Sequence, residues 1–395
     1  MTRVHALSNC WWSPAHNTMS DEYPALVSYP PNPGPNWKVE NVKVSRSPDE
    51  HELKVRMLAT GICHSDIVVA SIPDVAPGTR YPRILGHEGA GIVEEVGPGV
   101  TVAKVGDPVL LSYNFCRNCD LCNNDQQANC LKWMMLNAVG APGNFETLGG
   151  QDVNGNFFGQ SSFAGGSIVK EGSVVNVKDM VKDQEELKLL APLGCGMLTG
   201  SGALLNAADP KSHDIVMVTG VGGVGLAAIM AAKLAGCKEI IAVDKVASRL
   251  EVAKELGATK VINTSQEGSN LAKDTCNAVQ GQRISYVIET TGAIPVITAA
   301  MEALGKRGKH IQVGVPPFDS ELTLPLSKFF TENKTFECCY LGDTTGQIQI
   351  PKMIQWYHEG KFPIDKIVKF FPAKDALQAL QGMEDGSAIK PVIVW

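Results

Sequence analysis

The chain is constrained most by a glycine-rich word that stands between a predicted strand and a predicted helix. Residues 215–219 form an apolar, β-branched run that leads into Gly220-Val221-Gly222-Gly223-Val224-Gly225. A helical stretch at 226–235 follows, and a second strand at 239–243 ends at Asp244. Strand, Gly-x-Gly-x-x-Gly, helix, strand and acid make the dinucleotide-binding fingerprint, in which the glycines let the backbone approach a pyrophosphate at the helix N-terminus.

Asp244 also indicates which dinucleotide is preferred. It lies 19 residues after Gly225, where a carboxylate accepts hydrogen bonds from the ribose hydroxyls of NAD and repels a 2′-phosphate. Arg249, five residues later, weakens this argument slightly, because an arginine can accommodate that phosphate. We therefore expect NAD rather than NADP.

The pattern of the chain changes near residue 190. Beyond it, the βα alternation predicts a doubly wound parallel sheet, with strands at 260–263, 286–289 and 310–315 and helices at 247–256 and 295–304. Before it, short strands with period-two alternation are expected at 39–44, 52–59, 91–96 and 109–113. The fold class is therefore α/β, with a β-rich domain preceding the dinucleotide-binding sheet.

Four of the eleven cysteines are clustered in one short segment. They are Cys116, Cys119 and Cys122, each separated by two residues, and Cys130. Two-residue gaps let neighbouring thiolates face one tetrahedral ion, so the spacing predicts a closed structural zinc site. An iron–sulfur cluster is the alternative, because the first three positions also resemble a ferredoxin-type run.

A second candidate metal site begins with Cys63 and His87. They stand in the words Gly61-Ile62-Cys63-His64-Ser65-Asp66 and Gly86-His87-Glu88-Gly89-Ala90-Gly91. A thiolate and an imidazole are ligands that zinc selects. Two ligands do not complete a catalytic site, which needs a third protein ligand and an open position.

Composition excludes several classes of partner. The 395 residues carry 35 basic and 41 acidic side chains, a net charge of −6, without a basic cluster, so nucleic acid and anionic membranes are not expected partners. No apolar run is long enough to span a membrane, and residues 1–20 lack the apolar core of a signal peptide. We expect a cytoplasmic protein.

In these motifs the chain resembles the zinc-dependent alcohol dehydrogenases of the medium-chain dehydrogenase/reductase superfamily. The resemblance runs from about residue 23 to residue 395 and rests on the Gly-His-Glu-Gly-Ala-Gly word, the four cysteines and the glycine-rich word, in the family's order. It implies two zinc ions per chain and a homo-oligomer, dimer or tetramer. It also implies a GroES-like catalytic domain at 1–195, a Rossmann NAD-binding domain at 196–340 and a return to the catalytic domain at 341–395.

The resemblance also implies the missing metal ligand. Cys195 occupies the place of the family's third ligand to the catalytic zinc, although alone it would be read as a buried structural cysteine. Glu88 matches the glutamate behind the metal. Asp66 matches the carboxylate that hydrogen-bonds the ligating histidine and fixes its tautomer.

The implied reaction is hydride transfer between a primary alcohol and the nicotinamide ring, with a small-molecule alcohol or aldehyde as substrate. Ser65 matches the hydroxyl that begins the family's proton relay, and His64 matches a position that faces the cofactor pyrophosphate. Val68 stands where many relatives carry a relay histidine, so we expect the relay to end elsewhere or to pass through His64 or water.

Other roles follow by position in the family. Thr199, Val313 and Val315 match contacts of the nicotinamide, and Lys390 stands where many relatives place an arginine on the pyrophosphate. The matching substrate pocket involves Ser65, Ser112, Phe157, Phe158, Val315 and Tyr340. Ser112 in place of an aromatic residue widens this pocket, and with the two phenylalanines it favours an aryl or bulky alcohol, as aryl-alcohol dehydrogenases use. Alternatively, the two phenylalanines only fill the core.

The sequence leaves three alternative activities open. They are a quinone-reducing or non-catalytic relative, a carbonyl reductase of secondary metabolism, and an oxidiser of the formaldehyde–glutathione adduct. The first of these usually lacks the zinc ligands. The cysteines without metal spacing are expected to be small buried hydrophobes: Cys10, Cys237, Cys276, Cys338 and Cys339. The sequence does not decide whether Trp11 and Trp12 cover an apolar surface or a partner subunit.

Overall fold

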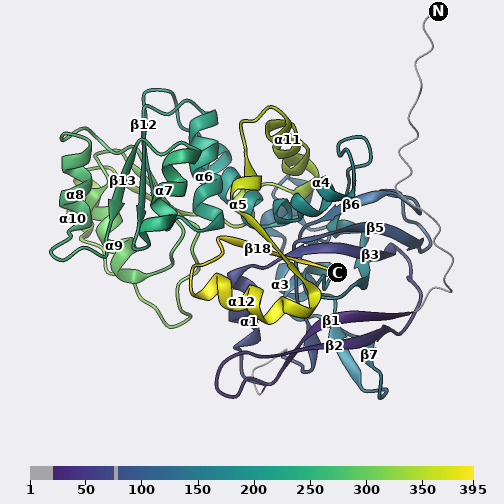
Figure 1. Ribbon diagram of the computed structural model, residues 1–395. Coiled ribbons are helices and arrows are strands. Elements are labelled where there is room, and N and C mark those ends of the chain that lie inside the picture. Colours follow the sequence, from purple (N-terminus) through teal and green to yellow (C-terminus); the bar gives the residue numbers. More distant parts are fainter. Residues whose placement is uncertain (1–20, 75–78) are drawn as a thin grey trace, which may run out of the picture.

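Three sheets organise residues 21–74 and 79–395, the part of the chain that the computed structural model describes. Two of them lie together in a β-rich lobe, and the third forms an α/β lobe (Figure 1). The expectations for Cys10, Trp11 and Trp12 lie outside the described residues. In the described chain, none of the helices has both the length and the apolar character needed to cross a bilayer.

The β-rich lobe contains a closed barrel and an open sheet of mainly antiparallel strands. The barrel order is β1 (Glu22–Tyr29), β2 (Asn36–Val44), β7 (Ala141–Thr147), β8 (Asp152–Gly155) and β4 (Arg83–Ile84). The sheet order is β10 (Val174–Asn176), β6 (Pro108–Leu111), β5 (Gly89–Val96), β3 (Glu52–Gly61), β18 (Lys390–Val394) and β17 (Val368–Pro372), with β9 (Gly166–Lys170) on β3. Strands β2, β3, β5 and β6 occupy the regions where period-two alternation predicts them.

The α/β lobe is a six-stranded parallel sheet, as predicted. Its order is β13 (Lys260–Asn263), β12 (Glu239–Asp244), β11 (Ile215–Thr219), β14 (Tyr286–Glu289), β15 (Lys309–Gln312) and β16 (Thr335–Cys338). The connecting helices are α6 (Gly223–Leu234), α7 (Ala247–Leu256), α8 (Leu271–Ala278), α9 (Ile294–Ala303) and α10 (Leu326–Thr331). The strand expected at 310–315 ends at Gln312, because the amides of Val313 and Gly314 both donate to the Glu289 carbonyl.

The two lobes are joined by segments that pass between them. After α4 (Gln184–Leu189) the chain enters α5 (Gly196–Gly202), which packs on α6. After β16, α11 (Gly346–His358) and α12 (Ala376–Glu384) lead to β18, whose Val392 pairs with Gly61 of β3. Figure 1 shows this last segment in yellow beside the purple N-terminal strands. The remaining short helices are α1 (His64–Ala70), α2 (Asp120–Asn123) and α3 (Trp133–Asn137).

Two cysteines are not buried as expected. Cys276 is exposed on α8, whose buried residues are Leu271 and Thr275, so the next position faces solvent. Cys338 is exposed at the end of the edge strand β16. Cys339 is buried and Cys237 is partly buried. The expectation of burial is therefore wrong for Cys276, which lies on the solvent-facing side of α8, and for Cys338, which ends an edge strand.

The packing of α5 on α6 predicts that a methyl group added at Gly200 destabilises the fold. A Cβ on Gly200 would lie 2.0 Å from the carbonyl oxygen of Val224, which is rigid helix backbone. We expect Gly200→Ala to lower the free energy of unfolding by about 2 kcal/mol, measured by urea denaturation. Gly222→Ala is the control, because no atom lies within 4 Å of its added Cβ. Equal stability of both variants would contradict close packing here.

Candidate active site

A buried carboxylate, Asp66, holds together two segments that are 20 residues apart in the sequence. Its Oδ2 accepts the amide of Cys63 at 3.0 Å, and its Oδ1 accepts the amide of Gly86 at 3.1 Å. The same Oδ1 lies 2.9 Å from Nδ1 of His87, which donates its proton there. Asp66 stands at the third residue of α1, and Cys63 caps that helix. The carboxylate therefore fixes the orientation of the His87 ring and turns Nε2 away from Asp66.

His87 Nε2 faces a group of other potential metal ligands. The ligand atoms of Cys63, His87, Glu88 and Cys195 all lie within 4.8 Å of one another. Nε2 is buried and has no hydrogen-bond partner among the described residues. An unsatisfied buried nitrogen is costly, and two sulfurs with one imidazole are the donor set of a three-ligand zinc site. These residues fit a catalytic zinc ion.

The protonation of the cluster reflects its burial and mutual contacts. The hydrogen bond from Cys195, followed by the proximity of His87, holds the pKa of the Cys63 thiol well below its usual value. The same contact raises the pKa of Cys195. Burial opposes the charged form of His87, but the charge of Asp66 and its hydrogen bond raise the pKa of the ring overall. Cys63 is thus the group most ready to act as a thiolate ligand.

Glu88 is held behind this cluster by a buried ion pair. Lys390 Nζ lies 2.5 Å from Glu88 Oε2 and donates to the carbonyl of Ile62 at 2.8 Å. The amide of Gly196 donates to Glu88 Oε1 at 3.0 Å. Burial raises the pKa of Glu88 to about 7, although Lys390 acts in the opposite direction. The pair links β18, the His87 segment and the start of α5.

Lys390 is predicted to contact the cofactor pyrophosphate, and its ammonium forms an ion pair with Glu88. Its stem passes close to the glycine-rich turn, because a Cβ on Gly223 would lie 3.7 Å from Lys390 Cδ. The side chain therefore spans the space between Glu88 and the turn at the N-terminus of α6.

The four-cysteine cluster is a second set of potential metal ligands. The sulfurs of Cys116, Cys119, Cys122 and Cys130 all lie within 4.8 Å of one another. Backbone amides point at them: Cys122 N lies 3.5 Å from Cys119 Sγ, and Cys116 N lies 3.4 Å from Cys130 Sγ. Hydrogen bonds from the amides of Cys122 and Leu131 lower the pKa of Cys119 to about 6. Four sulfurs around one point fit a closed zinc site.

The glycine-rich turn has the close backbone approach that its sequence predicts. A Cβ on Gly225 would lie 1.9 Å from the carbonyl oxygen of Gly220, which itself has a φ of 82°. Gly222 caps α6, and Gly223 and Val224 form its first turn. Asp244, at the end of β12, accepts the amides of Val221 and Val246 at 2.8 and 2.9 Å. Its carboxylate therefore lies directly beside the turn.

Four other predicted cofactor contacts lie on different elements of the structure. Thr199 is partly buried on α5, the helix that packs on α6. Val313 is partly buried after β15, whereas Val315 is 77% exposed and its carbonyl approaches Gly292. Arg249 lies on α7 beside Gly386 of the C-terminal segment, and its buried Nε has no partner among the described residues.

A group of aromatic side chains, here called the aromatic wall, begins at the His87 ring. Phe158 stacks on the His87 ring with centroids 4.4 Å apart, and Phe157 meets the same ring edge-on at 5.5 Å. Trp133 contacts Phe158 at 5.4 Å and Tyr340 at 4.8 Å. Burial, followed by the charge of Cys195, raises the pKa of Tyr340, which places this ring near the same cluster. The predicted residues Phe157, Phe158 and Tyr340 are thus brought together.

Trp133 and Gln160 belong to the site but were not expected from the sequence. Trp133 begins α3, three residues after Cys130, and no spacing rule singles it out. The amide nitrogen of Gln160 donates to the carbonyls of His87 and Ser112 at 3.0 and 2.8 Å, and its oxygen accepts the amide of Gly89 at 3.1 Å. A single glutamine in a turn gives no signal in the sequence, and its role depends on two distant backbone segments.

The remaining predicted residues lie at different depths. Ser65 Oγ lies 3.7 Å from Cys63 Sγ, while His64 and Val68 are exposed on α1. Ser112 is 1% exposed, and its hydroxyl donates to the carbonyl of Gly194 at 2.7 Å. Ser112 therefore supports the backbone that leads into Cys195.

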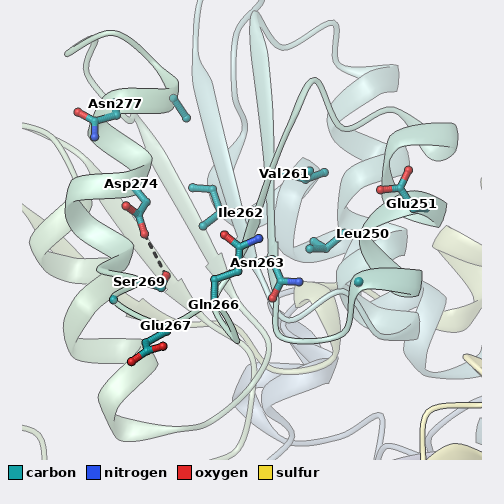
Figure 2. A pocket seen from close by; sticks show the side chains of 13 residues that line it. Leu250, Glu251, Val261, Ile262, Asn263, Gln266, Glu267, Ser269, Asp274 and Asn277 are labelled. Carbon is teal, nitrogen blue, oxygen red and sulfur yellow. Dashed lines mark hydrogen bonds between the residues drawn. The ribbon is translucent and has the colours of Figure 1, made fainter.

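A large cavity lies elsewhere, at the β13 edge of the parallel sheet (Figure 2). It measures about 800 Å³ and is lined by residues of α7, β13 and α8, including Asn263, Gln266 and Asp274. Asp274 accepts a hydrogen bond of 2.9 Å from Ser269, drawn as a dashed line. None of its lining residues belongs to the predicted site.

Comparison with known proteins agrees with this geometry. Residues 49–179 match the alcohol dehydrogenase GroES-like domain, and residues 223–359 match the zinc-binding dehydrogenase family. The chain is thus a zinc-binding dehydrogenase with a GroES-like domain. It belongs to the zinc-dependent alcohol dehydrogenase family, and the fold class inferred from the sequence is confirmed.

Three relatives illustrate the similarity. A geraniol dehydrogenase of Castellaniella defragrans is 35% identical over 90% of this chain and 94% of its own length. An S-(hydroxymethyl)glutathione dehydrogenase of Komagataella pastoris is 34% identical over 91% and 94%. The crystal structure of benzyl alcohol dehydrogenase from Acinetobacter calcoaceticus is 35% identical, with a TM-score of 0.85 over 94% of this chain and 99% of that one.

The contacts of Asp66 predict a specific loss of metal affinity. Asp66→Asn leaves the shape but replaces an oxygen acceptor with a donor beside Cys63 N, Gly86 N or His87 Nδ1. We expect zinc affinity at Cys63, His87 and Cys195 to fall about 10–100-fold, measured by chelator competition. The four-cysteine cluster in the same molecule is the internal control. Unchanged affinity at both clusters would contradict the role of Asp66.

Proposed function

We propose that this protein interconverts a primary alcohol, aryl or otherwise bulky, and its aldehyde by hydride transfer to or from NAD. The observation that carries the proposal is the aromatic wall that starts on the His87 ring. Phe158 stacks on that ring at 4.4 Å, so the apolar surface begins next to the proposed catalytic metal site. A flat or long apolar substrate fits such a wall better than ethanol does.

Two zinc ions per chain are part of the proposal. Cys63, His87 and Cys195 would hold the catalytic ion, and Cys116, Cys119, Cys122 and Cys130 would hold the structural one. When bound at the first site, zinc supplies Lewis acidity that lowers the pKa of an alcohol and polarises a carbonyl. The unsatisfied Nε2 of His87 and the lowered pKa of Cys63 support this assignment.

The chain's own residues orient the ligands and carry the proton. Asp66 keeps the Nδ1 proton on His87, so that Nε2 stays available as a ligand atom. Ser65, next to Cys63 in space, receives the proton that the alcohol loses and passes it toward solvent. Val68 has no titratable group, and exposed His64 on the same helix, or water, is the proposed alternative carrier. Glu88 lies behind the other ligands, where its ion pair with Lys390 holds it.

NAD is the proposed cofactor, with its pyrophosphate at the N-terminus of α6. Gly220, Gly222, Gly223, Val224 and Gly225 provide the turn, and Asp244 beside it is suited to the ribose hydroxyls. Thr199, Val313 and Val315 are the proposed nicotinamide contacts, and Arg249 flanks the adenosine end. The carboxylate of Asp244 opposes a 2′-phosphate, so NAD is preferred over NADP.

The relatives support the substrate class. Those named for geraniol and benzyl alcohol act, by their names, on a long or aromatic primary alcohol. Phe157, Phe158, Trp133 and Tyr340 are the proposed substrate wall, with Ser112 as a small residue behind it. The proposal also includes the division into a catalytic domain (1–195), an NAD-binding domain (196–340) and a return to the catalytic domain (341–395). It further includes a homo-oligomeric state and a cytoplasmic location. The ten described cysteines, all free thiols, accord with a reducing compartment.

Metal analysis tests the two-zinc proposal. We expect about two zinc ions per wild-type chain. Cys63→Ala should lose one zinc ion together with alcohol oxidation, because it removes one of three ligands. Cys119→Ala is the matched variant and should lose the other ion. Elemental analysis and activity assays check both. Full alcohol oxidation by Cys63→Ala would show that the proposed mechanism is wrong.

A panel of alcohols and aldehydes, assayed with NAD and with NADP, tests substrate and cofactor. We expect benzyl-type and long-chain primary alcohols to exceed ethanol in kcat/KM, with NAD preferred. Trp133→Ala should lower kcat/KM for aryl alcohols about tenfold, because it removes one apolar wall, and leave ethanol little changed. Trp133→Phe is the control and should retain most of the preference.

The same panel separates the glutathione-dependent alternative, which the Komagataella pastoris relative favours. Formaldehyde oxidation that requires glutathione, without turnover of aryl alcohols, would replace the proposed substrate class. Better turnover with NADP than with NAD would overturn the Asp244 argument.

A further inference from the structure

A second buried carboxylate, Glu289, lies in the parallel sheet and has no role in the reaction as described so far. It is the last residue of β14 and has no exposed surface. Its Oε1 accepts the amide of Thr291 at 2.8 Å and the hydroxyls of Thr291 and Thr219. Its Oε2 accepts the amide of Gly292 at 2.9 Å and the side chain of Gln312 at 2.7 Å.

All five hydrogen bonds to Glu289 come from donors, as an ionised carboxylate requires. Among the described residues, no lysine or arginine forms an ion pair with it within 4.0 Å. His310 is a titratable group close to this carboxylate, and its Nε2 lies 3.0 Å from the side-chain oxygen of Gln312. Burial lowers the pKa of His310, so this ring is neutral and supplies no counter-charge. Glu289 thus keeps a negative charge that dipoles stabilise and no cation neutralises.

The position of this charge in the sheet connects it to the dinucleotide. The strand order reverses direction between β11 and β14, and Glu289 stands at the carboxyl end of β14. Dinucleotides bind across such a switch point, with one half over each side of the sheet. Asp244 on β12 marks the adenosine half, so the nicotinamide half lies over the loops that follow β14 and β15.

Glu289 itself fixes those loops against one another. Its partners Thr219, Thr291 and Gln312 belong to three neighbouring strand ends. The loops touch closely, because a Cβ on Gly292 would lie 2.5 Å from the carbonyl of Val315. A Cβ on Gly314 would lie 2.3 Å from the amide of Gly292. The charge is therefore held rigidly beneath the surface that receives the nicotinamide.

We propose that Glu289 is a positioning residue whose buried charge favours the oxidised, cationic nicotinamide ring over the reduced, neutral one. This inference rests on the proposed function. A fixed negative charge in a dry site attracts a nearby cation more than a neutral ring of the same shape. Bound NADH then gives its hydride more readily to the aldehyde carbon, with a proton added to oxygen, leaving alcohol and NAD⁺. The site is thereby biased toward aldehyde reduction.

Binding of the two cofactor forms to the zinc-loaded enzyme tests this inference. Glu289→Gln keeps the shape and removes the charge, so we expect the Kd for NAD⁺ to rise about tenfold and the Kd for NADH to change less than about twofold. Calorimetry measures NAD⁺ binding, and nicotinamide fluorescence measures NADH binding. Equal changes in both Kd values would mean a merely structural role and would overturn the inference.

Variants of Gln312 provide an independent test should Glu289→Gln fail to fold. Gln312→Lys places a cation beside the unchanged carboxylate and should also raise the Kd for NAD⁺ relative to the Kd for NADH. Gln312→Met removes the same side chain without adding charge, so the ratio of the two Kd values should remain at the wild-type value. Identical ratios in the lysine and methionine variants would overturn the inference. Failure of the wild-type protein to bind either cofactor would instead overturn the proposed function.

Discussion

The close packing of α5 on α6 determines how far the cluster of Cys63, His87, Glu88 and Cys195 lies from the glycine-rich turn. Cys195 stands at the N-terminus of α5, and the turn opens α6. Because Gly200 has no side chain, the backbone of α5 comes into direct contact with the carbonyl of Val224. Hydride transfer needs donor and acceptor carbons at van der Waals distance, so this helix contact is the geometric condition for the chemistry.

Buried charges around the site are each matched by a specific partner. Asp66 accepts two amides and one imidazole proton, while Glu88 pairs with Lys390 and accepts the amide of Gly196. Taking such groups out of water is costly, and removing one partner leaves the other unsatisfied. Their partners come from α1, the His87 segment, β18 and α5. Both carboxylates are satisfied only when all these segments pack together. Their burial therefore favours a single arrangement of the segments.

Much of this architecture could be predicted because its signals are local. The turn at Gly220–Gly225 and the acid at Asp244 are close in sequence, as are Cys116, Cys119 and Cys122. Trp133 and Gln160 could not be found in this way, since their contacts depend on how distant segments pack. The ion pair of Lys390 with Glu88 could not be found from the sequence either, since it depends on the pairing of β18 with β3. Exposed Cys276 and Cys338 show that residue type alone does not decide burial, which also depends on the face of the helix and the place of the strand in the sheet.

The position of Trp133 gives the four-cysteine lobe a second significance. This residue follows Cys130 by three positions and supports the ring of Phe158, which in turn stacks on His87. Phe158 has a φ of 52°, an uncommon conformation for a bulky residue that its surroundings must hold in place. The four-cysteine lobe, which we propose to hold the structural zinc, thus helps to hold the aromatic wall in place. Substitutions in the segment after Cys130 can therefore change the aromatic wall while Cys63, His87 and Cys195 stay the same.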